Sequence, residues 1–497
     1  MRSSSIKLSV LISYITVIIN ILIQLLYTPW MIRKIGVSDY GIYSLVLCFL
    51  SYFLFDIGIS SAISRFVSKY NVEGDVFKLK ELYKIVTIVY ISIDLLLCLI
   101  FAILYPFLPN FFVALTSEEI STLQNVYIIA SIFSICNFTL KPLNGIMVAF
   151  EYFVPLKLLD LSERIMTIIS IVVFLYLGYG IYTLIFINGF VAFVIGLIKM
   201  IYLLNKRKLS IGIGTYDMEI LKSLFSFSIW VFIANIGDRL KLNLMPFVLG
   251  IYCGTTEISK FSLALGIEGF IWTIAIAVNG LFIPKLTNLV GDINVNEKVT
   301  RYMVKVGRFQ LMVLGYVIMG IICLGKEFIS LWVGSKFLDV YYILIFISFF
   351  DLFIYSQEIG SSYSFVINKV RYNAYISIVT AFISVILAVF LSKSYGAIGA
   401  GFSIFVALFL MVVQYSLFFK YKLHIDIIYY YKKCHCQFFP VFLVLICIFI
   451  PLKQFSPTNN YISFGLLSIV YTILFTILMA YSLTPEEKKE LLSRIKR

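Results

Sequence analysis

The stretch WVFIANIGDRLKLNLMPFVLG, from Trp230 to Gly250, decides what kind of protein this chain is. It is long enough to cross a bilayer as a helix, because about 20 apolar residues, each rising about 1.5 Å, span the hydrocarbon. Its middle nevertheless carries Asp238, Arg239 and Lys241. A charge at that depth costs at least about 2.5–3.5 kcal/mol. The guanidinium group of Arg239 cannot avoid this cost by losing its proton.

Helical spacing predicts where these polar groups point. Asn235, Arg239 and Asn243 recur every four residues and therefore share one face of the helix. A polar face within the membrane lies against the protein interior or a water-filled cavity, because lipid cannot solvate it. Two interpretations stay open: a cationic cavity for an anionic substrate, which we favour, and an internal Asp238–Lys241 pair that locks two helices together.

The composition is that of a polytopic membrane protein. Of the 497 residues, 61% are hydrophobic and only 13% are charged, and the mean hydropathy is +0.99. Soluble domains carry about 25% charged residues. The net charge is +14, but the basic residues lie in short loops between apolar runs. This pattern disfavours a nucleic-acid partner and favours anionic membrane lipids.

Catalytic, metal and cofactor motifs are not recognisable in the chain. The loop G-x-x-x-x-G-K-[ST] that binds nucleotide phosphates is absent, so ATP is not expected to drive the protein directly. The cluster Cys434-His435-Cys436 lacks a second ligand pair for zinc. Most of the eight cysteines lie inside apolar runs and read as small core residues. We therefore expect a protein that is not an enzyme and has no metal or cofactor.

Apolar runs bounded by charges or turn residues predict an all-α fold with about fourteen transmembrane helices. The fifth of these predicted helices, near residues 164–178, is short and could begin earlier, at Leu158. The predicted spans lie near residues 8–30, 41–63, 84–106, 122–150, 164–178, 181–204, 224–250, 258–284, 303–325, 341–367, 376–394, 397–419, 437–453 and 460–482.

Basic loops predict the orientation. Lysines and arginines gather in alternate loops, around residues 65–84, 206–208, 298–308, 369–371 and 420–433, and in the tail after residue 487. Because cytoplasmic loops carry an excess of Lys and Arg, both termini are expected on the cytoplasmic side. Arg33 and Lys34 are exceptions on an outer loop.

The first twelve spans contain a repeat. Tyr179-Gly180 recurs as Tyr395-Gly396, 216 residues later, and MVAFE (147–151) aligns with SFVIN (364–368). An offset of six spans leaves both halves in the same orientation, and parallel repeats of this kind hold the substrate between two lobes. We predict a six-helix lobe over 1–210, a second over 211–425, a central cavity, and two extra C-terminal helices with a tail over 426–497.

Further polar residues inside spans are candidates for the cavity wall. Asn20 and Gln24 lie four apart on the first span, Asn137, Lys141 and Asn144 share a face of the fourth, and Arg65 lies at the inner end of the second. Lys141 could instead extend its ammonium group to the cytoplasmic interface, and Lys199 is expected to do so. The complete predicted set of cavity residues is Arg239, Lys241, Lys141, Asn235, Asn243, Asn137, Asn20, Gln24 and Arg65.

Acidic residues inside spans are candidates for ion coupling, because burial favours the protonated form of a carboxylate. Structural pairing with Lys or Arg is the alternative for each of them. The set is Glu268, Asp351, Glu358, Asp238 and Asp56, and Asp94 is a further intramembrane acid.

Four motifs resemble those of a known family. IGVSDYGIYSL (35–45) with DIGISSAISRF (56–66) resembles the first two helices of bacterial polysaccharide-unit (O-antigen, Wzx-type) flippases of the multidrug/oligosaccharidyl-lipid/polysaccharide (MOP) exporter superfamily. FISLWVGSKF (328–337) and YGAIGAG (395–401) resemble the segments before the tenth and twelfth helices of that family. The resemblance covers essentially the whole chain.

The resemblance implies two six-helix lobes around a cavity that opens alternately to each side of the bacterial inner membrane. It implies an undecaprenyl-diphosphate-linked oligosaccharide as cargo and, as a further partner, the polysaccharide polymerase machinery. The cations of the family's cavity would correspond most naturally to Arg239, Lys241 and Lys141.

We therefore expect a flippase that moves this cargo from the cytoplasmic to the outer leaflet by alternating access, coupled to H+ or Na+. One alternative is a cation-coupled multidrug exporter of the same superfamily, against which the bases on spans four and seven count. A second is a lipid II flippase, although the first span here offers only Asn20 and Gln24 where that class carries more basic residues. A third is a membrane scaffold for a polysaccharide-assembly complex.

Overall fold

The computed structural model describes residues 20–53, 59–206, 237, 240–279, 286, 289, 294–367, 369–454, 460–485 and 487–488. Throughout these residues the regular structure is helical. Nine helical segments in the described part are long and apolar enough to cross a membrane, which makes the chain a multi-pass membrane protein. The chain divides into two compact units, Met1–Ser262 and Leu263–Arg497.

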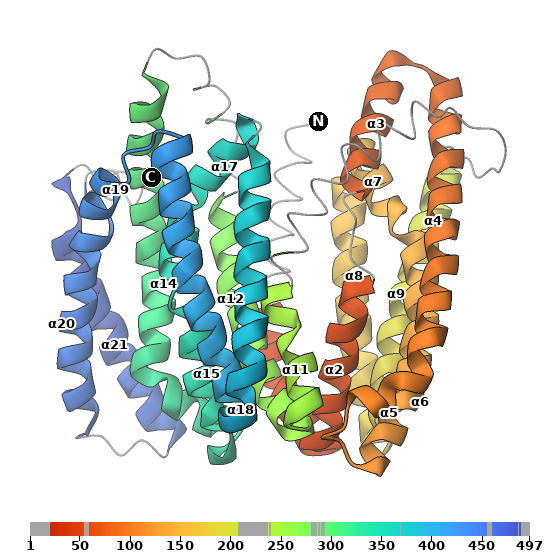
Figure 1. Ribbon diagram of the computed structural model, residues 1–497, viewed down its shortest axis with the longest axis horizontal. Helices are drawn as coiled ribbons and strands as arrows, with labels where there is room; N and C mark the ends of the chain where they lie inside the picture. Colours follow the sequence, from red (N-terminus) through yellow and green to blue (C-terminus); the bar gives the residue numbers. More distant parts are fainter. Residues whose placement is uncertain are drawn as a thin grey trace. The chain divides into compact units, whose positions relative to one another are not determined.

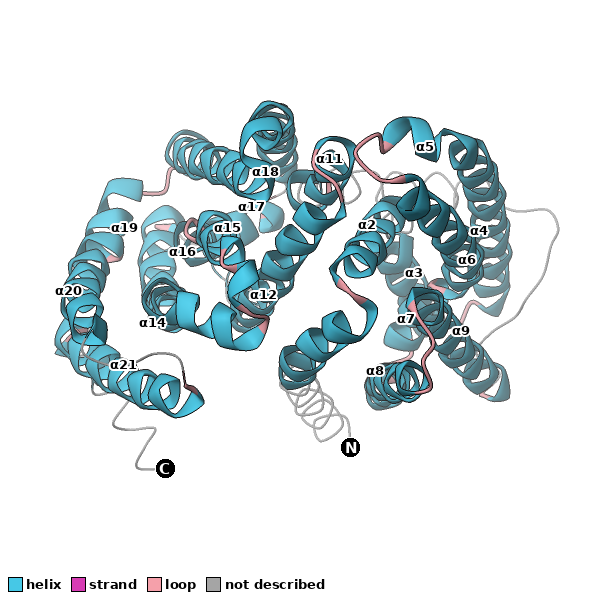
Figure 2. Ribbon diagram, turned by 90° about the horizontal axis from the view of Figure 1, so that it is seen from below, coloured by secondary structure: helices cyan, strands magenta, loops and turns pink. Residues whose placement is uncertain are grey.

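The first unit is a bundle in which the helices of the first six spans pack against one another. In Figure 2, α7, α8 and α9 lie side by side, and α6 packs on α9 and α2. A first helix is described over residues 20–35. The others are α2 (Val37–Phe53), α3 (Ile59–Glu73), α4 (Val76–Leu104), η1 (Tyr105–Phe107), α5 (Leu108–Phe111), α6 (Ser117–Leu140), α7 (Pro142–Ala149), α8 (Phe153–Tyr176), α9 (Ile181–Asn205), α11 (Met245–Tyr252) and the start of α12 (Thr255–Asn279).

A capping carboxylate ties three helix starts of this unit together. Thr116 and Glu119 form a reciprocal capping box at the start of α6. The same Glu119 carboxylate accepts hydrogen bonds from the hydroxyl groups of Ser38 (2.5 Å) and Thr255 (2.6 Å), which lie at the starts of α2 and α12. Gly41 permits this close approach, because a Cβ atom there would lie 2.3 Å from the backbone oxygen of Thr255.

This contact gives a test of the packing. Replacing Gly41 with Val should destabilise the purified protein by about 1–3 kcal/mol, because the added side chain meets backbone that cannot move aside cheaply. Replacing Gly465 with Ala is the control, since a Cβ there meets open space on α21 (Tyr461–Ser482). Thermal unfolding in detergent measures both variants. Equal melting temperatures for Gly41→Val and the native protein would contradict the described packing.

The second unit contains the remaining helices. They are the rest of α12, α14 (Val295–Trp332), η2 (Ser335–Phe337), α15 (Asp339–Ser348), α16 (Asp351–Ile354), η3 (Tyr355–Gln357), α17 (Glu358–Val366), α18 (Val370–Lys422), α19 (Ile427–Lys433), α20 (His435–Gln454) and α21. Within α18, Gly396 has non-helical dihedrals (φ 55°, ψ −138°) that mark the turn predicted between the eleventh and twelfth spans.

The last two helices dock along α14, beside which they run in Figure 1. At one end of the contact, the Lys453 ammonium group lies 2.6 Å from the Glu327 carboxylate. Midway, Gly315 leaves room for the ring of Phe442, which a Cβ would approach to 2.5 Å. The hydroxyl group of Tyr471 donates to the backbone oxygen of Tyr316 (2.6 Å). The predicted lobe boundaries at residues 210 and 425 stay predictions.

The fourth and tenth spans, which correspond in the predicted repeat, are both interrupted. Pro142 has no N–H to continue the ladder, so α6 ends at Leu140 and α7 begins after Lys141. In the tenth span the one-turn elements α16 and η3 separate α15 from α17. The alignment of residues 147–151 with 364–368 pairs Lys141 with Glu358, the first residue of α17. Interrupted helices at corresponding positions are a common feature of transporter repeats.

Most predicted spans match the observed helices to within several residues, and the fifth span is the main correction. It was expected over 164–178, or from Leu158, but α8 begins at Phe153. The cause is a set of four charged residues in the first half of the helix, Lys157, Asp160, Glu163 and Arg164. These charges lowered the apparent hydropathy, although α8 accommodates them through polar contacts within the unit.

Candidate functional site

Several predicted site residues lie outside the described residues: Arg239, Asn235, Asp238 and Asp56. Nothing about their surroundings follows from the structure, so their assignments stay predictions. Lys241 and Asn243 are described and half-buried in the helical residues just before α11. Four charged residues lie on α8: Lys157, Asp160, Glu163 and Arg164.

Arg164 occupies the middle of a membrane-length helix. It is the twelfth of the 24 residues of α8, so it lies about 17 Å from one end and about 18 Å from the other at about 1.5 Å per residue. Its side chain is exposed rather than covered by the unit. A permanent charge such as that of Arg164 requires water, polar protein or an anionic ligand around it wherever the helix lies within the membrane.

The contacts of Arg164 leave most of its hydrogen-bonding capacity unused. Its Nε donates to the Oδ1 atom of Asn20 on the first helix (3.1 Å). Its two terminal amino groups donate no hydrogen bond to any described residue. Tyr27 and Tyr43 lie within electrostatic range of the guanidinium group. The Tyr43 hydroxyl accepts a hydrogen bond from Asn188 Nδ2 on α9 (3.2 Å).

The hydroxyl group of Tyr27 is a second unused group. It is buried and has no hydrogen-bond partner among the described residues. Asn20, Gln24 and Tyr27 follow each other at spacings of four and three residues, so they share one face of the first helix. We call the group formed by Asn20, Tyr27, Tyr43, Arg164 and Asn188 the Arg164 site.

An ion pair joins α8 to α9. Lys199 of α9 is 6% exposed, and its ammonium group lies 2.9 Å from Asp160 and 3.0 Å from the Asn144 side-chain oxygen. Lys157 approaches the other Asp160 oxygen to 3.8 Å. The expectation that Lys199 extends toward the membrane surface is therefore wrong, because a carboxylate within the bundle binds its charge.

The polar face predicted for the fourth span turns toward α9. Asn137 donates through Nδ2 to the backbone oxygen of Gly189 (3.1 Å), and Asn144 accepts from Lys199. Lys141 is half-buried, with its ammonium group 5.2 Å from the centre of the Phe138 ring. Arg65, on α3, is exposed. The structure thus brings Asn137 and Asn144 into helix packing, and Asn20 into contact with Arg164.

The predicted coupling residues of the second unit occupy interior positions. Glu268 on α12 and Asp351 on α16 are buried, and Glu358 is half-buried at the start of α17. All three have polar or electrostatic partners within the structure. In the first unit, Asp94 accepts a hydrogen bond from Thr139 (2.5 Å). No cluster of three or more His, Cys, Asp or Glu residues suited to a metal ion occurs in the described part of the chain.

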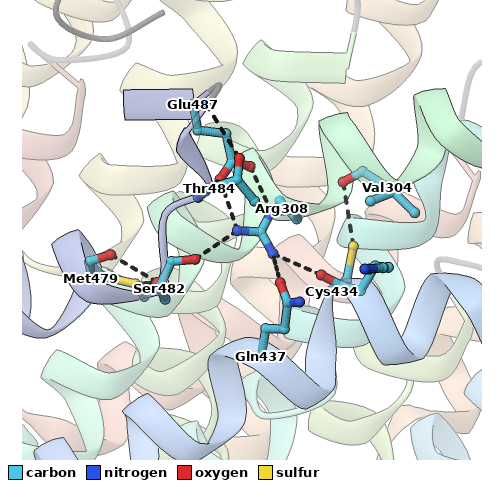
Figure 3. A network of polar contacts seen from close by, with 9 residues as sticks. Val304, Arg308, Cys434, Gln437, Met479, Ser482, Thr484 and Glu487 are labelled. Carbon is cyan, nitrogen blue, oxygen red and sulfur yellow. Dashed lines mark hydrogen bonds and ion pairs between the residues drawn. The ribbon is translucent and has the colours of Figure 1, made fainter. Parts of the chain in front are cut away.

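Arg308, in the second unit, shows what a structural arginine looks like in this protein (Figure 3). It is 3% exposed, and its Nε and Nη2 atoms bind the two carboxylate oxygens of Glu487 at 2.6 and 2.8 Å. Nη2 also donates to the backbone oxygen of Ser482 (2.9 Å). Nη1 donates to the backbone oxygen of Lys433 (2.8 Å) and to the side-chain oxygen of Gln437.

All five N–H donors of Arg308 are therefore used, and its guanidinium carbon lies 4.9 Å from the centre of the Phe438 ring. This arrangement fastens the chain after α21 to α14 and to the start of α20. Arg164 differs, because one donor meets Asn20 and the others meet no described residue. The geometry identifies Arg308 as a structural clamp and Arg164 as a group able to bind an external anion.

The clamp should dominate the local stability of the C-terminal helices. Replacing Arg308 with Gln should lower the free energy of unfolding by about 3 kcal/mol, because it leaves a largely buried carboxylate unpaired. Adding Glu487→Gln should recover part of that loss. Thermal unfolding of both variants measures the effect, and strictly additive losses would contradict a direct pair.

The clamp also predicts a dependence on pH. Burial raises the pKa of Glu487, but hydrogen bonds from Arg308 and from the backbone of Thr484 outweigh it, so the pKa lies below its ordinary value of 4.5. Its contribution to stability should be complete above about pH 4.5 and decline as the pH falls further. Melting temperatures between about pH 7 and about pH 4 check this. A Glu487→Gln variant should lose this component of the acid sensitivity, and an unchanged pH profile would contradict the assignment.

The sequence contains a signal for the Arg164 site that the predicted fifth span does not include. Lys157, Asp160 and Arg164 recur at spacings of three and four residues, which places them on one face of a helix. With the fifth span assigned to 164–178, three of the four charges fell into a loop and Arg164 fell at its edge. Extending the helix toward its N-terminus is the step that identifies the site.

The fold defines a class: helical proteins that cross the membrane many times. Among solved structures, the chain is similar to the lipid II flippase MurJ in an inward closed conformation, with a TM-score of 0.73 and 17% identity over 95% of this chain and 98% of that one. It is also similar to an inward-facing multidrug resistance MATE family transporter of the MOP superfamily, with a TM-score of 0.63 and 15% identity over 79% and 95% of the two chains.

Sequence comparison then gives the family. Residues 7–290 match the model of the family described as polysaccharide biosynthesis protein. The capsular polysaccharide biosynthesis protein CapF of Staphylococcus aureus is 27% identical over 272 residues, which cover 53% of this chain and 67% of that protein. The chain belongs to the polysaccharide biosynthesis protein family, whose structural neighbours here are flippases and transporters of the MOP superfamily. The resemblance noted in the sequence is thereby confirmed.

Proposed function

We propose that the protein is a flippase that moves an undecaprenyl-diphosphate-linked oligosaccharide from the cytoplasmic to the outer leaflet of the bacterial inner membrane. It works by alternating access, coupled to H+ or Na+, with both termini in the cytoplasm and without a catalytic step of its own. Membership of a polysaccharide biosynthesis family supports the saccharide cargo. The observation that carries the proposal is the position of Arg164, a cation with unused donors at the middle of α8.

The physical reason is the cost of moving the diphosphate group. A diester of diphosphoric acid keeps a negative charge on each phosphate at neutral pH, and about 30 Å of hydrocarbon cannot solvate those charges. A guanidinium group presents donors in a planar fork that matches phosphate oxygens. Arg164 offers such a fork, and the Tyr27 hydroxyl adds a donor beside it. The lipid tail stays in the bilayer while the charged group binds to protein.

The predicted residues outside this site keep their proposed roles. Arg239, Lys241 and Lys141 would supply further positive charge along the route of the diphosphate. Glu268, Asp351 and Glu358 would take up the coupling ion, and their interior positions suit that role. The polysaccharide polymerase machinery is the proposed partner that receives the translocated unit.

The two rival cargoes differ from this proposal in charge and in composition. A drug exporter for organic cations would place carboxylates, not an arginine, at mid-membrane depth. A lipid II flippase shares the diphosphate, and the structural similarity to MurJ extends over nearly the whole chain. Membership of the polysaccharide biosynthesis family favours a saccharide unit of surface polysaccharide over lipid II.

The proposal predicts that Arg164→Gln abolishes surface polysaccharide export while Arg164→Lys retains a fraction of it. Glutamine keeps a hydrogen-bonding group but removes the charge, and lysine keeps the charge but loses the planar fork. Export is measured as surface polysaccharide in a strain that depends on this protein, with membrane levels checked by immunoblotting.

The matched control is Arg301→Gln, which removes an exposed arginine paired with Glu297 and should leave export unchanged. Normal export by Arg164→Gln, at normal protein level, would remove this residue from the mechanism. Restored growth of a lipid II flippase mutant by the native protein would instead favour lipid II as cargo.

A further inference from the structure

A carboxylate beside the Arg164 site is paired with no described residue. Glu163 is the residue before Arg164 on α8, is half-buried, and makes no hydrogen bond or ion pair with any described residue. It lies within electrostatic range of Lys199, Asp160 and Arg164. The other carboxylate of this helix, Asp160, is bound by Lys199 at 2.9 Å and approached by Lys157.

The two cations near Glu163 are already held elsewhere. Lys199 binds Asp160 and Asn144, and Arg164 binds Asn20 through its Nε atom. The Glu163 carboxylate therefore lies near positive charges but forms no ion pair with them among the described residues. An anion that binds the free donors of Arg164 would lie close to the Glu163 carboxylate and be repelled by it.

A charge count shows how this repulsion can be relieved. Lys157, Asp160, Glu163, Arg164 and Lys199 comprise three cations and two carboxylates, a net charge of +1. A diphosphate diester carries a negative charge on each phosphate, so one positive charge does not balance it. If Glu163 takes up a proton, the same five residues gain one positive charge and match the ligand.

We propose that Glu163 is the proton-responsive carboxylate of the Arg164 site, so that an anionic diphosphate ligand binds when Glu163 is protonated and is repelled when it is ionised. The step is a simple proton uptake: the carboxylate takes a proton from water, and no other bond forms or breaks. This inference rests on the proposed function, because it takes the cargo to be a diphosphate.

The other groups that face Glu163 do not supply the same response. Asp160 is bound by Lys199 and approached by Lys157. Arg164 does not titrate in the accessible range. Tyr27 and Tyr43, on the first helix and on α2, lie near Arg164 and are neutral phenols at neutral pH. Asn20, Asn144 and Asn188 do not titrate.

Linkage gives the sign of the effect. Because the protonated form of Glu163 binds the anion better, affinity rises as the pH falls through the titration of Glu163, and bound anion favours proton uptake. A unit charge a few ångströms from the ligand in a partly desolvated site changes affinity by roughly tenfold or more.

The experiment measures binding of farnesyl diphosphate-linked N-acetylglucosamine to the full-length protein in nanodiscs, at about pH 8 and about pH 5.5. The native protein should bind roughly tenfold more tightly at the lower pH. Glu163→Gln should bind equally at both pH values, with the affinity that the native protein shows in acid. Glu163→Ala serves as a second variant with the same expectation. Glu297→Gln, which removes an exposed carboxylate on α14, should behave as the native protein.

Three results would count against the proposals, and they are distinguishable. Native-like pH dependence in both Glu163 variants would overturn the role of Glu163 and leave the flippase proposal intact. Binding by the native protein that does not change with pH would do the same. Absence of binding by native protein at both pH values would overturn the proposed function, and the role of Glu163 with it.

Discussion

A guanidinium group at the middle of a membrane-length helix is the constraint on which this protein depends. It cannot lose its proton, and hydrocarbon cannot solvate it, so the chain must surround it with polar groups or with a ligand. Arg164 satisfies only part of this requirement internally, through Asn20. The neighbouring tyrosines, the Lys199–Asp160 pair and Glu163, which pairs with no described residue, add further polar groups on and beside α8.

Arg164 and Arg308, which both lie within long helices, show that the same residue type serves opposite purposes. Arg308 uses all five donors on Glu487, Gln437 and backbone oxygens, and so holds the last two helices to α14. Arg164 keeps its terminal amino groups free of the described residues. The number of N–H donors that have an acceptor distinguishes Arg308 from Arg164 more clearly than depth or charge does. Hydropathy does not distinguish these two arginines, because it registers only that a charge interrupts or flanks an apolar run.

The sequence predicts the helical fold well, because hydrocarbon thickness fixes helix length and turn residues mark the ends. The sixth span was expected over 181–204 and α9 covers Ile181–Asn205; the last span was expected over 460–482 and α21 covers Tyr461–Ser482. The interruptions of the fourth and tenth spans are not part of the sequence prediction. The predicted fifth span is too short because four charged residues share this helix. Their polar contacts are tertiary interactions, which hydropathy cannot register.

The candidate site was predicted only in part for the same reason. Asn20 was expected to face the cargo, and it contacts Arg164, but Arg164 itself was taken as a span boundary. Lys199 is expected from the sequence to extend toward the interface, but its ammonium group binds Asp160. The role of Arg239 stays a prediction, because this residue lies outside the described residues, and the same reasoning applied to α8 points to Arg164.

Accessibility of position 164 in the membrane tests the central claim most directly. In a variant whose eight native cysteines are replaced, Arg164→Cys is exposed in intact and in inverted membrane vesicles to a charged thiol reagent that cannot cross the bilayer. We predict modification from an aqueous side. A cysteine that resists the reagent in both vesicle orientations, while an exposed loop position reacts, would show that this depth of α8 faces lipid or packed protein, and would contradict the account.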